Sequence, residues 1–167
     1  MLRSAFILGL SMIAGASDGA AQRRANPEAS DNKSINISGR VADKTFNANG
    51  GGSCKHAPEA SIYDVPAALW LVDYSRPDDV QLKQLNLTLW RPKNGSPDQV
   101  SLSVETGSAS HSVNIGGRGK QAGSGRVTLS PSGEGGRFEF KGKDAAGTRL
   151  EVAISCSGFA GVEAEGG

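Results

Sequence analysis

Short segments in which apolar and polar residues alternate dominate the second half of the chain. Leu85, Leu87 and Leu89 occupy every second position and so share one parity, odd or even, in the numbering. The same period of two recurs further along the chain. Successive side chains of a β-strand point to opposite faces, so this pattern predicts strands that bury one face. The clearest examples are residues 85–90, 100–105, 111–115, 137–141 and 150–156.

Earlier and shorter segments extend the same pattern. Ile35, Ile37, Gly39 and Val41 share one face, and further candidate strands lie at residues 61–63, 68–74 and 127–129. Turn-forming residues separate these segments, and 23 glycines in 167 residues favour many tight turns over long helices. We therefore expect an all-β protein, an antiparallel β-sandwich (immunoglobulin-like or related) of about seven to nine short strands with one disulfide.

The N-terminal residues have the layout of a secretory signal. Arg3 supplies a positive charge, and residues 5–14 form an apolar run. Small residues come next, and cleavage is predicted either after Ala16 or after Ala21. The run is shorter than the roughly 20 residues that cross a bilayer, which favours cleavage over anchoring. The predicted organisation is a signal peptide at 1–21, a flexible segment at 22–34, one β-sandwich domain at 35–157 and a disordered tail at 158–167.

The two cysteines, Cys54 and Cys156, are the only ones in the chain. Export to an oxidising compartment predicts that they form a disulfide. Cys156 has the parity of Leu150, Val152 and Ile154, so its sulfur should point into the core, while a glycine run before Cys54 is expected to be a flexible loop.

A metal site is the competing use of these cysteines. Cys54 and His56 share a parity, and with Cys156 and His111 they would make a zinc-type ligand set. Since the cysteines lack short paired spacing and export favours their oxidation, we expect neither a metal nor a cofactor.

Charge and motifs exclude several classes of function. A net charge of +1, from 18 basic and 17 acidic residues, lacks the basic excess of nucleic-acid binders. No serine lies in a Gly-x-Ser-x-Gly elbow between a strand and a helix, so we assign no catalytic residues. Carboxylate pairs of the glycosidase type assemble only in space, and the candidates for such a pair are Glu59, Asp64, Asp73, Asp78 and Asp79.

Two sets of residues are candidates for binding. Trp70, Tyr74 and Trp90 would form an aromatic surface for a sugar or a protein if they face solvent, or part of the core if their strands are covered on both sides. The second set lies in the glycine-rich stretch 116–126, whose backbone amides could cradle an anion. Its cationic members are Arg118, Lys120 and Arg126.

The closing segments, residues 136–143 and 150–157, resemble the end of exported β-sandwich antigens of the mycobacterial 19-kilodalton lipoprotein type. Those proteins also carry a cysteine at the end of the last strand, so the resemblance implies a sandwich architecture. This chain lacks the lipid-attachment cysteine of that family, and the membrane anchor therefore does not carry over.

These patterns predict a periplasmic or secreted, non-catalytic β-sandwich that acts as a binding or interaction module. The expected partner is a protein or a glycan, with no nucleic acid and no stable membrane insertion after signal cleavage. The alternative is a carbohydrate-active enzyme or carbohydrate-binding protein that uses aromatic and carboxylate residues.

Overall fold

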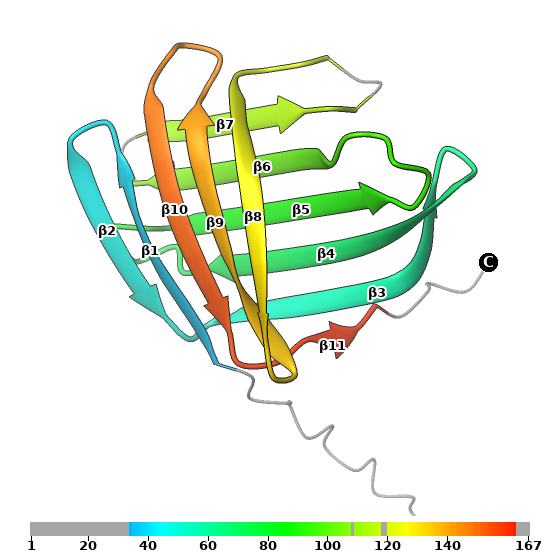
Figure 1. The fold of residues 1–167 in the computed structure, drawn as a ribbon. Coiled ribbons are helices and arrows are strands. Elements are labelled where there is room, and N and C mark those ends of the chain that lie inside the picture. Colours follow the sequence, from blue (N-terminus) through cyan, green and yellow to red (C-terminus); the bar gives the residue numbers. More distant parts are fainter. Residues whose placement is uncertain (1–33, 108, 118–119, 163–167) are drawn as a thin grey trace, which may run out of the picture. The chain divides into compact units, whose positions relative to one another are not determined.

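The computed structural model describes residues 34–107, 109–117 and 120–162, and these residues form two β-sheets (Figure 1). The predicted signal peptide and almost all of the predicted flexible segment lie outside the described residues. The first sheet contains β1 (Ile35–Val41), β2 (Lys44–Asn49), β8 (Ser124–Ser132), β9 (Gly135–Lys143) and β10 (Arg149–Cys156). The second contains β3 (Gly52–Ile62), β4 (Val65–Ser75), β5 (Gln84–Pro92), β6 (Gln99–Thr106), β7 (Ala109–Ile115) and β11 (Ala160–Gly161).

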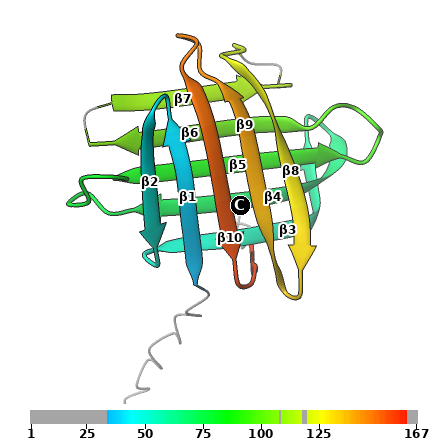
Figure 2. The ribbon, with the colours of Figure 1, turned by 60° about the vertical axis from the view of Figure 1, so that its left-hand side comes forward.

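Hairpins between consecutive strands build most of both sheets. The first sheet has the order β2-β1-β10-β9-β8, and the second has the order β11-β3-β4-β5-β6-β7. In the first sheet β1 lies between β2 and β10, so early and late parts of the fold are neighbours (Figure 2). The antiparallel register runs from Ile35 opposite Cys156 to Val41 opposite Leu150.

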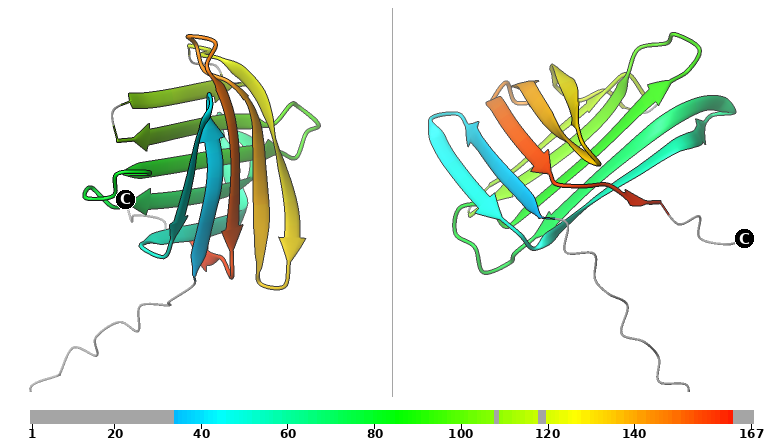
Figure 3. Two further views of the ribbon diagram at one scale, coloured as in Figure 1. Left: turned by 90° about the vertical axis from the view of Figure 1, so that its left-hand side faces the viewer. Right: turned by 60° about the horizontal axis from the view of Figure 1, so that its bottom comes forward.

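The core lies between the two sheets, whose strands run across each other (Figure 3). Alternation along each strand directs one set of side chains into this layer. Gly39 shows how closely the layer is packed: it takes an apolar position on β1, and a Cβ there would collide with the Phe46 ring on β2. The largest side chains that are fully buried include Tyr74, Phe138, Ile35, Leu85, Leu87, Leu89, Leu102, Leu150 and Ile154.

The predicted disulfide between Cys54 and Cys156 is confirmed. It joins β3 of one sheet to β10 of the other, with 6.1 Å between the two Cα atoms. The flexible loop expected in the glycine run before Cys54 is shorter than predicted, because β3 already begins at Gly52 and Cys54 is buried within it, opposite Val72 of β4. The glycine run makes the turn before it, where Gly50 and Gly51 have positive φ angles.

An all-β sandwich is confirmed, but the described residues form eleven strands rather than seven to nine. The pattern missed β2, most of β3 and β11, which are polar, irregular or very short. The tail predicted at 158–167 is ordered at its start: Phe159 packs against the core, and Ala160 and Gly161 pair with Lys55 and His56 of β3. Within the described ranges no helix could span a membrane.

The turn between β3 and β4 holds two residues in the left-handed backbone region. Tyr63 has a φ of 51° and Asp64 a φ of 65°. Two consecutive positive φ angles are typical of a type I′ hairpin turn, which usually contains Asn and Gly. A bulky residue such as Tyr63 is strained in this conformation, at a cost of about 1–3 kcal/mol.

Replacing Asp64 by Gly should relieve part of this strain. We expect Asp64→Gly to raise the free energy of unfolding by about 0.5–1 kcal/mol, since glycine adopts positive φ without a steric penalty. Urea unfolding followed by circular dichroism measures the change. Ser75→Gly, at an exposed position near the end of β4, is the control and should lower stability; a loss of stability in Asp64→Gly would contradict the prediction.

Candidate functional site

A largely buried hydrogen bond between a histidine and an aspartate joins the margins of the two sheets. His111 lies on β7 in the second sheet, and Asp144 follows β9 in the first sheet. The His111 Nδ1 atom is 2.8 Å from Asp144 Oδ2, and the two side chains are 14% and 9% exposed. His111 faces inward because it has the parity of Val113, which is buried in the core.

The β9–β10 turn holds the Asp144 carboxylate in place. The backbone N–H of Thr148 donates to Asp144 Oδ1 at 2.8 Å, and the Asp144 N–H donates to the Thr148 carbonyl at 3.0 Å. Burial alone would raise the pKa of Asp144, but the hydrogen bonds from His111 and Thr148 outweigh it and hold that pKa below its usual value. Asp144 is therefore ionised at neutral pH.

An ionised carboxylate only accepts hydrogen bonds, so the proton of the neutral His111 ring resides on Nδ1. Nε2, the other ring nitrogen, is then an acceptor in the neutral ring and a donor in the protonated ring. The pair thus fixes both the orientation and the tautomer of the imidazole. This is the arrangement that a binding site needs in order to present one defined polar group.

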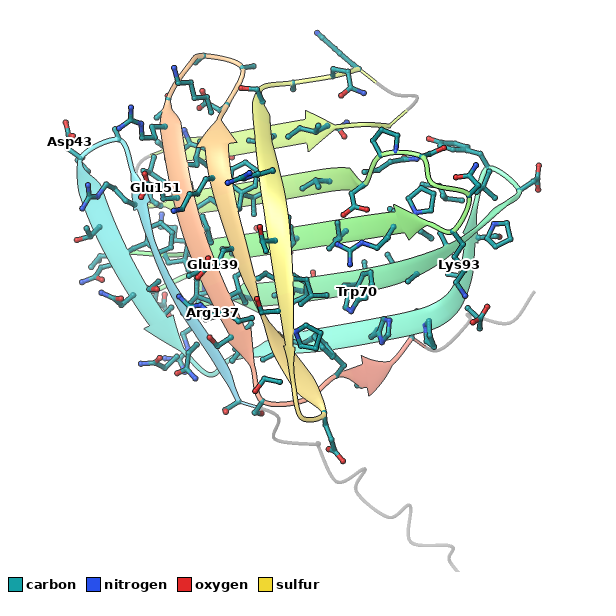
Figure 4. All side chains as sticks on the ribbon, viewed as in Figure 1. Asp43, Trp70, Lys93, Arg137, Glu139 and Glu151 are labelled. Atoms are coloured by element: carbon teal, nitrogen blue, oxygen red, sulfur yellow. A yellow bond between two sulfur atoms is a disulfide. The ribbon has the colours of Figure 1, made fainter. Side chains whose placement is uncertain are left out.

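His111 and Thr148 line a cavity of about 710 Å³ at the open end of the sandwich, which we call the end cavity. Its other walls are the β1–β2 hairpin at residues 41–46, the facing ends of β6 and β7, and residues 80–81. The β1–β2 and β6–β7 turns lie at the same end of the sandwich (Figure 1). Asp43, which also lines the cavity, marks the tip of the β1–β2 hairpin in Figure 4.

The hydrogen-bonded loop between β4 and β5 presents an apolar side chain, Val80, to the end cavity. Asp79 Oδ1 accepts hydrogen bonds from the backbone N–H groups of Gln81 and Leu82, at 2.7 and 3.2 Å. These two backbone groups are the main cause of the lowered pKa of Asp79. Leu82 is fully buried, whereas Val80 is 83% exposed, so the loop anchors one apolar residue and holds the other out in solvent.

Two of the aromatic candidates from the sequence, Trp70 and Tyr74, lie in the core. Trp70 is 8% exposed and stacks on His56 with ring centroids 4.6 Å apart; Figure 4 labels it on β4. Tyr74 is 1% exposed, and its pKa is raised by burial and by the Asp79 carboxylate. Both side chains therefore contribute to packing.

Trp90 lies on the other face of the second sheet. It pairs in register with Leu69 of β4 and Gln99 of β6, and its side chain is half-buried. Since Trp70 pairs with Leu89, the two tryptophans belong to opposite faces. They do not form a common surface.

The glycine-rich stretch folds back on β7 where the structure describes it. Asn114 and Ala122 exchange backbone hydrogen bonds, and Gln121 bonds to Gly116 N and Gly117 O. The three cationic candidates of this stretch are not gathered by any described contact: Lys120 and Arg126 are exposed, and Arg118 is outside the described residues.

The four residues of the alternative metal site are in three different places. Cys54 and Cys156 form the disulfide, His56 stacks on Trp70, and His111 pairs with Asp144. Burial lowers the pKa of His56, which favours its neutral form. No group of three or more His, Cys, Asp or Glu residues that could hold a metal ion occurs among the residues that the structure places.

The carboxylates considered for glycosidase chemistry also have separate roles. Glu59 pairs with Lys93 at 2.6 Å, and Asp79 holds its own loop together. Asp73 accepts a 2.8 Å hydrogen bond from Asn86 once the Asn86 amide is oriented with its nitrogen toward it.

Sequence reasoning did not find the end cavity. It placed His111 at the start of the alternating segment 111–115 and assigned no role to Asp144. The inward parity of His111 was a usable signal, because a histidine aimed into a core requires a polar partner. The identity of that partner was not encoded locally, since it lies 33 residues away on the other sheet.

Comparison with known protein families, curated proteins and solved structures gives no match for this chain. The similarity of the closing strands to the 19-kilodalton lipoprotein type stays a prediction about architecture.

Proposed function

We propose that this protein is an exported, non-catalytic binding module that takes a small organic molecule in the end cavity. The leader-like N-terminus and the disulfide together favour a periplasmic or secreted protein, because disulfides persist in oxidising compartments. A disulfide across the sheets also suits a small domain that works outside the cell. The site itself consists of His111, Thr148 and the walls contributed by the β1–β2 hairpin and Val80.

The observation that carries this proposal is the imidazole of His111, held by a buried carboxylate in the wall of a cavity of about 710 Å³. Small-molecule sites commonly measure about 300–1,000 Å³ and combine apolar walls with a few fixed polar groups. A ring whose orientation is already set loses little entropy when a ligand binds.

The lining indicates the chemistry of the ligand. Val41, Phe46 and Val80 supply apolar surface, while His111 and Lys44 supply polar and cationic groups. A matching ligand has an apolar body and, at one end, a hydrogen-bond donor for Nε2 of the neutral His111 ring or an anionic group for Lys44. Metabolites of this shape are the class that we expect to bind.

The dye 1-anilinonaphthalene-8-sulfonate, which has an aromatic body and a sulfonate, is a probe of this class. We expect the folded protein to bind one dye molecule, and Val80→Asp to weaken binding about tenfold. The loss combines one apolar contact with repulsion of the sulfonate. Fluorescence titration gives the dissociation constant, and near-ultraviolet circular dichroism confirms that the fold is intact.

Val80→Thr is the matched control, because it preserves the shape of the side chain without adding charge, and its dissociation constant should stay within a few-fold of the original value. Dye binding that Val80→Asp leaves unchanged would contradict the end cavity as the site. Failure of the folded protein to bind the dye would count against the proposed ligand class.

A further inference from the structure

A second, smaller pocket lies at the opposite end of the second sheet from the β6–β7 turn. It has a volume of about 350 Å³ and is formed by the β3–β4 turn, the β5–β6 connection and Gly116. We call it the hairpin pocket. Tyr63, Asn94, Ser96 and Gln99 give it an aromatic ring, two amides and a hydroxyl. Lys93, which marks this end of the sheet in Figure 4, immediately follows the pocket residue Pro92.

Trp90 adjoins the hairpin pocket. Pro92 and Gln99 both line the pocket; Trp90 lies two residues before Pro92 on β5 and directly opposite Gln99 on β6. Alternation along the strand therefore places Trp90 on the same face as Pro92. Tyr63, which lines the pocket itself, is 49% exposed.

The conformation of Tyr63 is a separate sign of function. The β3–β4 turn keeps this large side chain exposed at its tip in the left-handed region, with a φ of 51°. Asn or Gly would make the same turn without strain. Strained, exposed residues of this kind cluster at ligand sites.

Two ion pairs lie around the hairpin pocket. Arg91 and Asp98 form an ion pair at 2.9 Å, and Lys93 and Glu59 form another at 2.6 Å. The residues that line the pocket carry no carboxylate, ammonium or guanidinium group. The pocket lining is therefore uncharged, and the nearest carboxylate of the β3–β4 turn, Asp64, is exposed beside it. The end cavity, by contrast, is lined by Lys44, His111 and Asp43.

We propose that the hairpin pocket and Trp90 form a binding site for a neutral polysaccharide. Aromatic faces stack on the apolar faces of sugar rings, while amide and hydroxyl groups bond to sugar hydroxyls. The neutral lining matches an uncharged polymer and disfavours an anionic one. Proline-rich peptides also dock on aromatic surfaces, but the amides and hydroxyl around the hairpin pocket match the many hydroxyls of a sugar better.

Affinity electrophoresis in gels that contain laminarin, dextran or galactomannan tests this site. We expect at least one of these neutral polysaccharides to retard the protein. Tyr63→Ser and Trp90→Ala should each weaken that retardation about tenfold, and Tyr63→Phe and Trp90→Phe should retain most of it because the rings remain. Val80→Asp, in the end cavity, should leave it unchanged, which separates this proposal from the proposed function.

Several outcomes would overturn the site. These are the absence of retardation by all three polymers, retardation that persists in Tyr63→Ser, and retardation by the anionic polymer alginate alone. Binding of a decaproline peptide without any polysaccharide binding would assign the pocket to a peptide instead. Should Trp90→Ala fail to fold, Tyr63→Ser at its exposed position decides the question.

Discussion

Replacement of Cys54 and Cys156 together by alanine should lower the free energy of unfolding by about 4–5 kcal/mol, the largest effect that we expect from any change to this protein. The bond spans a sequence separation of 102 residues. Breaking a cross-link over so long a loop releases a large amount of conformational entropy in the unfolded chain. Typical domains have a total stability of about 5–15 kcal/mol, so the variant is expected to be marginal at 37 °C.

The position of the disulfide adds to this effect. It lies between β3 and β10, in opposite sheets, and Cys156 is opposite Ile35 at the start of β1. Both cysteines are 5% exposed and belong to the core, so they also contribute packing that alanine only partly replaces.

Guanidinium unfolding of the oxidised protein, the reduced protein and the Cys54→Ala/Cys156→Ala variant measures the loss. The slope of free energy against denaturant should rise in the variant, because the unfolded chain expands without the cross-link. The reduced protein should behave like the variant. A loss below about 1 kcal/mol would show that the core alone holds the sheets together.

Replacement of Asp144 by Asn should cost about 2–4 kcal/mol, the second largest expected effect. The change leaves the buried His111 without its charged partner and weakens the hydrogen bond to the Thr148 N–H. Asp43→Asn, at an exposed position on the neighbouring hairpin, should change stability by less than about 0.5 kcal/mol and is the matched control. Urea unfolding at pH 7 gives both values.

The same carboxylate predicts how stability depends on pH. The pKa of Asp144 is lower in the folded state than in the unfolded chain, so in acid the unfolded state binds more protons. The contribution of Asp144 to the free energy of unfolding is complete above its pKa in the unfolded chain, about 3.9. It is lost as the pH falls through the lower pKa of the folded state. The Asp144→Asn variant should therefore lack this part of the decrease in the free energy of unfolding at low pH.

A double-mutant cycle with His111→Gln isolates the interaction between the two side chains. Additive effects of Asp144→Asn and His111→Gln would contradict a direct coupling across the sheets, as would an unchanged acid profile in Asp144→Asn.

The alternation of apolar and polar residues within individual segments predicted much of this fold. The strands at Leu85, Val100 and Leu150 follow from alternation alone, and the pairing of Cys54 with Cys156 follows because no other cysteine is available. β2 escaped detection because only Phe46 and Ala48 are buried in it, and β3 because it mixes glycine, charge and proline. Such edge or irregular strands depend on their neighbours more than on their own pattern.

The sequence by itself determined an all-β chain, the inward direction of Cys156, and one disulfide. Alternation is a local property, and it needs only a few consecutive residues to be visible. Only the tertiary structure decided that His111 meets Asp144, that Trp70 and Trp90 face opposite ways, and that Tyr63 and Pro92 line one pocket. These arrangements arise from strand register and from the way the two sheets cross, which depend on the packing of the whole core and not on any one segment.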